Sequence, residues 1–146
     1  YYDGIEWLND NVSGLVNICE SYGLSYTDNC IVSANTGLPT ILGWQTHEWL
    51  WRFHGVVDKS TGLLVNDPTK PDIWADILNP RYSDVDSIYL GTDVTAIKSI
   101  LAEYDVTYLI LGDIERFMYP DMQESVLTSC GTIVFQSDDF YIIQVA

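Results

Sequence analysis

The segment Gly37–Arg52, "GLPTILGWQTHEWLWR", holds the densest group of side chains able to do chemistry in this chain. Trp44, Trp49 and Trp51 offer flat apolar faces of the kind on which sugar rings stack. Polar groups able to hydrogen-bond hydroxyls or a phosphate stand among them: His47, Glu48 and Arg52. The segment therefore predicts the lining of a ligand pocket, and the residue types leave a packed core with buried ion pairs open as the alternative.

The same segment does not match a metal site. "HEWLW" lacks the second histidine of the zinc-protease motif HExxH, and His47 and His54 lie seven residues apart without a third ligand. Cys19, Cys30 and Cys130 form neither a CxxC motif nor a Cys/His ligand spacing. We expect no metal and no cofactor, and we expect the cysteines as either a Cys19–Cys30 disulfide or three buried thiols.

Basic residues are scarce, since 6 Lys and Arg stand against 21 Asp and Glu. Each arginine is therefore expected to have an acidic partner, so Arg52, Arg81 and Arg116 could form structural salt bridges instead of lining a site. The expected acidic partners are Glu48, Asp84 and Glu115. The net charge of −15 repels DNA, RNA and anionic lipid headgroups, which excludes nucleic acid as a partner.

Common catalytic motifs are absent from the sequence. It contains no GxSxG nucleophile elbow, no GxxxxGK[ST] phosphate loop and no GxGxxG dinucleotide fingerprint. The chain also has no run of about 18 apolar residues that would span a bilayer, and it begins without Met, as a piece of a longer protein would. We expect no catalytic residue in these 146 residues and no transfer activity from them alone.

The first third of the chain predicts one helix and short strands. Residues 4–11 have helix-like apolar spacing, with Asp3 as the N-cap. Residues 15–19 predict a strand, the β-branched residues 30–34 a second, and residues 40–43 a third.

The rest of the chain predicts an α/β arrangement. Residues 55–80 are rich in Pro, Asp, Asn and Gly, which predicts a surface excursion with a helical turn at 73–78. A helix capped by Thr92 leads into the apolar run 106–111, a strand buried on both faces. The segment 132–145 predicts an antiparallel hairpin. Together these elements predict one α/β domain over residues 1–146, with a mixed sheet of about five strands, helices packed on it and a C-terminal β-hairpin.

Three stretches of the sequence carry a resemblance to a known family. They are "NTGLPTILGWQTHEWLWR", "RYSDVDSIYLGTDV" and "ILAEYDVTYLILGDIERFMYP". In these stretches the chain resembles the soluble C-terminal domain of the large prokaryotic membrane proteins called the YYY-domain, or DUF2298, family. That family is grouped by architecture with GT-C glycosyltransferases, which use lipid-linked sugars.

The resemblance implies a partner, a location and a site. It implies a parent with a transmembrane part preceding Tyr1 in the same chain, and a domain on the extracytoplasmic side of the cell membrane. The residues that match the family's motifs are the candidate substrate-binding residues: Trp44, His47, Glu48, Trp51, Arg52, Arg81, Glu115 and Arg116. We expect them to converge in space, with one Arg–Glu pair setting the geometry and with Trp44 and His47 edging a shallow groove.

The function expected on this basis is assistance to a membrane glycosyltransferase. The domain would bind an acceptor or a lipid-linked sugar near the membrane surface. A structural or protein-interaction domain, with the Trp-rich segment as its core, is the alternative that the sequence leaves open. Burial of Trp44, Trp51 and Arg52 without an adjoining cleft would favour that alternative.

Overall fold

A mixed sheet of four strands forms the centre of the computed structural model, which describes residues 1–146. The strand order is β1 (Asn17–Cys19), β4 (Val106–Leu111), β6 (Phe140–Gln144) and β5 (Thr132–Ser137). β1 runs parallel to β4, whereas β6 is antiparallel to both β4 and β5. The predicted mixed α/β domain with a C-terminal hairpin is confirmed, with four strands in the main sheet instead of about five.

Strand β4 is buried on both faces, as its continuous apolar sequence predicts. Leu109 and Leu111 belong to a larger apolar cluster, whereas Ile110 between them belongs to a smaller one. Neighbouring β6 repeats the alternation, because Ile143 joins the larger cluster and Ile142 the smaller. The period of two along each strand thus divides the core between the two faces of the sheet.

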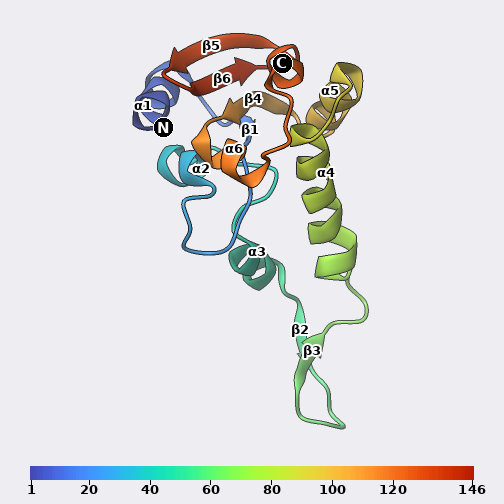
Figure 1. The fold of residues 1–146 in the computed structure, drawn as a ribbon. Coiled ribbons are helices and arrows are strands. Elements are labelled where there is room, and N and C mark those ends of the chain that lie inside the picture. Colours follow the sequence, from blue (N-terminus) through green and yellow to red (C-terminus); the bar gives the residue numbers. More distant parts are fainter.

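Helices cover both faces of the sheet. Figure 1 shows α1 (Tyr2–Asn11) and α2 (Ile31–Thr36) at one end, and α4 (Asn79–Tyr89) and α5 (Val94–Glu103) at the other. Two short helices, α6 (Asp113–Met118) and α7 (Glu124–Thr128), connect β4 to the hairpin. The apolar residues of α5 recur at helical spacing and face inward, since Ile97 and Leu101 are buried and Val94, Ile100 and Tyr104 pack against the larger cluster.

Two predicted helix caps are wrong by one or two positions. The side chain of Asp93, not Thr92, caps α5 by accepting hydrogen bonds from the backbone N–H groups of Thr95 and Ala96 at 2.8 and 3.2 Å. Asp3 lies inside the first turn of α1, where its negative charge interacts favourably with the positive end of the helix dipole.

The strand predicted at residues 30–34 is wrong, because this segment enters helix α2. The carboxylate of buried Glu20 accepts hydrogen bonds from the N–H groups of Val32 and Ser33 at 3.0 and 2.8 Å, which stabilises the first turn. Burial, with a further contribution from the charge of Glu115, raises the pKa of Glu20 to about 8. A long-range cap of this kind leaves no mark in the local sequence.

The strand predicted at residues 40–43 is likewise wrong. Thr40 makes one isolated parallel bridge to Ile18, and the chain then turns into helix α3 (Gln45–Arg52). The three cysteines are free and buried, so of the two alternatives the structure contains three thiols.

A small hairpin occupies half of the segment expected to run over the surface. Strands β2 (Gly55–Val57) and β3 (Leu64–Asn66) pair antiparallel and project away from the body (Figure 1). The helical turn predicted at 73–78 is η1 (Ile73–Leu78), a π-helix that leads directly into α4. Ile73 and Leu78 are buried, so this part of the segment belongs to the core.

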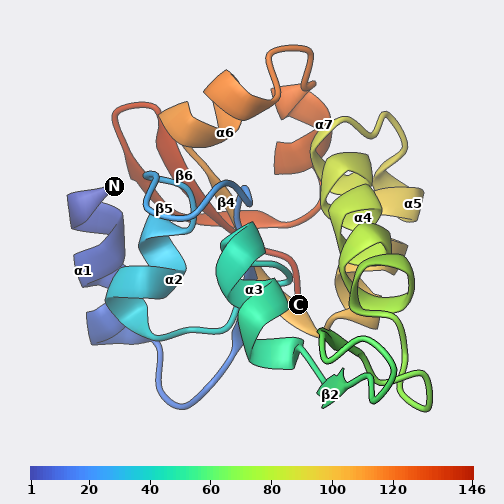
Figure 2. The ribbon, with the colours of Figure 1, turned by 90° about the horizontal axis from the view of Figure 1, so that it is seen from below.

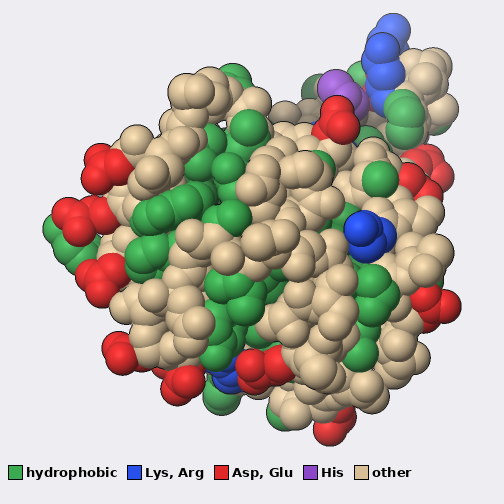
Figure 3. Space-filling view, turned by 90° about the horizontal axis from the view of Figure 1, so that it is seen from above, with side chains coloured by type: hydrophobic (Ala, Val, Ile, Leu, Met, Phe, Trp, Pro, Cys, Tyr) green, Lys and Arg blue, Asp and Glu red, His purple; other side chains and the backbone are tan.

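Acidic side chains greatly outnumber basic ones, since 21 Asp and Glu stand against 6 Lys and Arg. In the face shown in Figure 3, Asp and Glu surround the rim, and basic groups are isolated. None of the helices combines the length and the apolarity needed to cross a bilayer.

Candidate functional site

A groove between α2 and α3 holds most of the aromatic and polar residues singled out in the sequence. Figure 2 shows α3 between α2 on one side and α4 on the other. We call this groove, which has a volume of about 620 Å³, the aromatic groove. Its lining comprises Cys30, Ser33, Ala34, Pro39, Thr40, Gly43, Trp44, His47, Glu48, Trp51 and Arg52.

Helical spacing places the aromatic side chains of this groove in a row. Trp44, His47 and Trp51 are three and four residues apart, so they lie on one face of α3. The His47 ring centroid is 5.3 Å from that of Trp44 and 5.8 Å from that of Trp51. Trp51 is 81% exposed, whereas Trp44 and His47 are half-buried. The ring planes are inclined to one another by 59° and 80°, so the three rings form a tilted cluster in which the exposed Trp51 indole offers the open face for a stacked ring.

Tyr26 adds a further ring to this aromatic cluster, although no motif or apolar period in the sequence selects it. Its ring centroid lies 5.5 Å from Trp44 and 5.3 Å from His47, and the side chain is 83% exposed. Ser25 Oγ, next in sequence, lies 2.9 Å from Nδ1 of His47 and fixes the orientation of the imidazole. Both residues come from the turn-rich segment 20–29, where neither apolar period nor motif marks a position.

The expected Arg–Glu pair that sets the geometry is present on α3. Glu48 Oε2 accepts from Arg52 Nε at 2.8 Å, one helical turn away, and Glu48 Oε1 accepts from the Gly43 N–H at 3.1 Å. One carboxylate thus joins the guanidinium to the loop before the helix. A side chain on Gly43 would press on this carboxylate, since an added Cβ would lie 3.1 Å from Oε1.

Trp44 is held from behind by the 23–29 loop. Its Nε1 donates to the Asn29 carbonyl at 2.8 Å, and the Gln45 N–H donates to the Gly23 carbonyl at 3.1 Å. The backbone of Gly23 approaches the Asn29 side chain so closely that no Cβ would fit between them. The indole face that borders the groove is therefore positioned by the fold before any ligand arrives.

A second groove, on the other side of α3, brings in Arg81. We call it the arginine groove; its volume is about 480 Å³. It is lined by Asn17, Pro39, Thr40, Ile41, Arg52, Arg81, Glu103, Tyr104 and Asp105. Arg81 Nη1 donates to the Ile41 carbonyl at 2.7 Å, and the guanidinium lies 5.4 Å from the centre of the Tyr104 ring. Asp84, one of the expected acidic partners, instead accepts from the Tyr104 hydroxyl at 2.6 Å.

Glu115 and Arg116 do not join the other candidates, so the expected convergence of all eight residues is wrong. Arg116 binds Glu124 through two parallel hydrogen bonds of 2.6 and 3.0 Å, away from both grooves. These bonds lower the pKa of Glu124. Helix α6 follows the C-terminal end of β4, whereas the arginine groove lies beside the N-terminal end of that strand. Arg116 therefore pairs with Glu124 and not with a residue of either groove.

Glu115 is instead a buried structural acceptor, 1% exposed. It accepts from the Tyr1 hydroxyl, from Gly112 N–H at 3.0 Å, and from both the N–H and the hydroxyl of Ser21 at 3.1 and 2.9 Å. The Ser21 hydroxyl in turn accepts from Asn29 Nδ2 at 3.2 Å. Since Asn29 also holds Trp44, Glu115 supports the aromatic groove from a distance without lining it.

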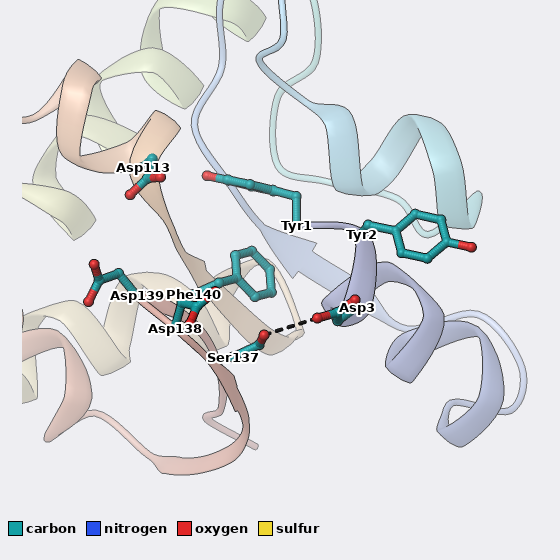
Figure 4. A pocket seen from close by; sticks show the side chains of 8 residues that line it. All are labelled: Tyr1, Tyr2, Asp3, Asp113, Ser137, Asp138, Asp139 and Phe140. Carbon is teal, nitrogen blue, oxygen red and sulfur yellow. Dashed lines mark hydrogen bonds between the residues drawn. The ribbon is translucent and has the colours of Figure 1, made fainter.

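A third concave surface lies beside the N-terminus and contains none of the candidate residues. Figure 4 shows its lining, in which Asp3 from α1 accepts a hydrogen bond of 3.1 Å from the Ser137 hydroxyl. The pocket, of about 240 Å³, is lined by Tyr1, Tyr2, Asp3, Asp113, Ser137, Asp138, Asp139 and Phe140. Nowhere in the structure are three His, Cys, Asp or Glu side chains placed to hold a metal ion. Four of the eight residues that line this pocket are aspartates, so its character is acidic.

The arrangement around α3 places one hydroxyl beside an imidazole but shows no third group that would orient the pair for catalysis. His47 has Ser25 as its nearest hydroxyl, without a carboxylate behind the ring to orient it as a base. Comparison of the chain with family models and with curated proteins found no match to either.

Proposed function

We propose that this domain binds carbohydrate through the aromatic groove, as an extracytoplasmic part of a GT-C-like membrane glycosyltransferase of the YYY-domain type. Its role would be to hold an acceptor or a lipid-linked sugar near the membrane surface. Its partners would be the transmembrane part of the same chain and the sugar. The 146 residues alone would transfer no sugar.

One observation carries the carbohydrate part of the proposal. Trp44, His47 and Trp51 form an open aromatic row on a groove whose polar rim is set by the Glu48–Arg52 pair. A core of tryptophans would be closed, yet Trp51 is 81% exposed and borders the groove. Flat aromatic faces beside directional donors and acceptors suit a ring that has an apolar face and an equatorial belt of hydroxyls.

The direct test is sugar binding to the isolated domain. Methyl hexosides of glucose, galactose and mannose can be screened by tryptophan fluorescence. We expect at least one of them to quench or shift the emission. Trp51→Ala should weaken that binding about tenfold or more, since it removes one stacking face. Leu50→Ala is the matched control, because Leu50 is 54% exposed on the same helix and does not line the groove. Equal losses in the two variants, or no response to any hexoside, would contradict sugar binding at this site.

The membrane-transferase part of the proposal is tested in cells. Deletion of the parent gene should change the lipid-linked sugars or surface glycans of the cell, as read by mass spectrometry. A parent carrying Trp51→Ala should reproduce the change in part. Unaltered glycans after deletion would contradict the transferase assignment and leave the binding measurement as an independent result.

A protein-interaction role is the second candidate, and the β2–β3 hairpin favours it. Val57, Leu63 and Leu64 are 62–65% exposed on a projecting ribbon whose strands contain no buried residue. Exposed apolar side chains on both faces of a ribbon favour contact with another surface. Cross-linking from the hairpin in the full-length parent would identify that surface, and a link to another protein instead of the parent's own membrane part would support this role.

A further inference from the structure

The aromatic groove and the arginine groove are neighbours that share part of their lining. Pro39, Thr40 and Arg52 border both. The shared residues lie at the C-terminal end of α3 and on the loop before it, so one concave surface passes around the end of this helix. A ligand seated on the aromatic row would therefore have its neighbouring group within reach of the arginine groove.

The arginine groove contains two of the three arginines of the chain, each with unused donors. Arg52 donates only through Nε, to Glu48, so both of its terminal nitrogens lack a protein partner. Arg81 spends only Nη1 on the Ile41 carbonyl. These two bonds orient the guanidinium groups and leave their remaining N–H groups available for an anion.

A hydroxyl without a hydrogen-bond partner belongs to a residue that borders both the aromatic groove and the arginine groove. Thr40 Oγ1 is buried and has no hydrogen-bond partner, although Thr40 lines both grooves. Because this oxygen has no exposed surface, a ligand in the grooves would not reach it in this structure, so the two arginines are the groups that would bind an anion there.

The carboxylates of this groove limit how much negative charge it accepts. Glu103 and Asp105 are exposed and border it, so they offset Arg52 and Arg81 within the lining. Glu48, which pairs with Arg52, adds a third carboxylate, so the two grooves together hold three acidic groups and two guanidinium groups. The site therefore relies on directional N–H donors and suits a phosphoryl group of low charge, not a polyphosphate.

We propose that the two grooves form one bipartite site for a sugar phosphate, with the sugar ring on the Trp44–His47–Trp51 row and the phosphoryl oxygens on Arg52 and Arg81. This inference rests on the proposed carbohydrate binding and names the ligand class of that same surface. No bond is made or broken, and the site binds the phosphoryl group without reacting with it.

The test compares three probes on the isotope-labelled domain: hexose 1-phosphates of glucose, galactose and mannose, the corresponding methyl hexosides, and inorganic phosphate. The chain has only three arginines, so their Nε–Hε signals can be assigned by substitution. Hexose 1-phosphate should shift the signals of Arg52 and Arg81 and those of the Trp44 and Trp51 indoles, while the Arg116 signal stays in place. It should also bind about tenfold more tightly than the methyl hexoside or inorganic phosphate.

Variants separate the phosphoryl contact from the sugar contact. Arg81→Met should weaken hexose 1-phosphate binding about tenfold and leave methyl hexoside binding unchanged, and Arg81→Lys should restore part of the loss. Lys98→Met is the charge-matched control, because Lys98 is exposed on α5 and lines neither groove. Glu103→Gln should tighten hexose 1-phosphate binding, which a merely structural role for Arg81 would not explain.

The outcomes distinguish failure of this inference from failure of the proposed function. Methyl hexosides that bind as tightly as hexose 1-phosphates, without shifts at Arg52 and Arg81, would overturn the phosphoryl site and leave carbohydrate binding intact. Inorganic phosphate that shifts the arginines while no sugar shifts the tryptophans would overturn the bipartite site and the sugar proposal together. A hexosyl farnesyl phosphate that binds more tightly than hexose 1-phosphate would support the site with a lipid-borne ligand, and equal binding would support a soluble sugar phosphate.

Discussion

Two tryptophans two positions apart on α3 have opposite surroundings. The Trp49 ring packs against the larger core cluster and lies 4.9 Å from the centre of the Phe53 ring, whereas Trp51 is 81% exposed. A separation of two residues turns side chains by about 200° around a helix, so the two indoles point to opposite sides. At the scale of single residues, the same amino acid therefore serves stability at one position and binding at the other.

This contrast predicts different consequences for two similar substitutions. Trp49→Ala should lower the free energy of unfolding by about 2 kcal/mol or more, because it leaves a cavity beside the core. Trp51→Ala should change it by less than about 0.5 kcal/mol. Urea denaturation of both variants measures the difference. Comparable destabilisation by the two would show that Trp51 is packed in solution.

Burial of Glu20 predicts a pH dependence of stability. Its pKa is raised in the folded chain to about 8, so the folded state binds a proton that the unfolded state releases at about pH 4.3. This group's contribution is therefore fully favourable below about pH 4.3 and is lost as the pH rises toward 8. Carboxylates with lowered pKa values, such as Asp58 and Glu124, lose their contribution only at lower pH.

We expect wild-type stability to fall between pH 5.5 and pH 8.5, and Glu20→Gln to reduce that fall by about 2 kcal/mol. Urea midpoints of both proteins at the two pH values provide the measurement. Glu6→Gln, an exposed carboxylate on α1, is the matched control and should retain the wild-type slope. An unchanged slope in Glu20→Gln would mean that another group titrates.

The cysteines predict a simple pattern of reactivity. Burial raises the pKa of the Cys19 and Cys30 thiols well above the ordinary value, so both remain protonated thiols, which react slowly. A thiol reagent should therefore react slowly with the native protein and should label three groups in denaturant. One labelled group in denaturant would instead reveal a Cys19–Cys30 disulfide.

At the scale of elements, the β2–β3 hairpin contributes little to the core. Its pairing buries none of its six strand residues, and Val57 and Leu64 are each 62% exposed. Val57→Thr together with Leu64→Thr keeps β-propensity and should change the free energy of unfolding by less than about 0.5 kcal/mol per site. Binding of a hydrophobic dye should decrease, because exposed apolar surface is removed.

Val106→Thr is the matched substitution in a buried strand and should destabilise by more than about 1 kcal/mol, since it buries an extra hydroxyl. Thermal unfolding of the two variants separates the exposed hairpin from the core. A large loss in the hairpin variant would indicate that the ribbon packs against a second molecule in solution.

The elements that the sequence predicts well are those whose pattern is local. The apolar face of α5 and the continuous run Val106–Leu111 are read from spacing alone, and so is the hairpin around Asp138 and Asp139. The helix at α2 could not be predicted, because its cap is Glu20, a residue outside the helix. β-Branched residues at 31 and 32 indicated a strand, and a tertiary contact overrode that preference.

The candidate site could be predicted only where its residues share an element. The row on α3 follows from helical spacing, and the Glu48–Arg52 pair follows from the separation of four residues. Glu115 and Arg116 could not be placed relative to α3, because nothing in the sequence tells at which end of β4 the α3 segment lies. Tyr26 was missed for a related reason, since its position depends on a loop that returns to α3.

At the scale of the whole molecule, the charge of −15 predicts salt sensitivity. Like charges on a compact surface repel, and salt screens that repulsion as the Debye length falls from about 30 Å at 10 mM to about 8 Å at 150 mM. The melting temperature should therefore rise by several degrees over this range, as measured by calorimetry. The rise should nearly disappear near the isoelectric point of about 4.1, where the net charge vanishes. A salt effect that persists there would have another origin.

The parallel contact between β1 and β4 has a consequence for the order in which the chain acquires its structure. Asn17 pairs with Val106, so β1 can pair only after a strand that lies much later in the sequence has been made. On a ribosome, residues 17–105 emerge before the strand that completes their sheet, whereas β5 and β6 meet as soon as both are made. Closing so long a loop costs entropy before the core repays it, so we expect this contact to form late in folding. Nascent β1 therefore has no strand partner until β4 emerges, and it is a segment that a chaperone would protect.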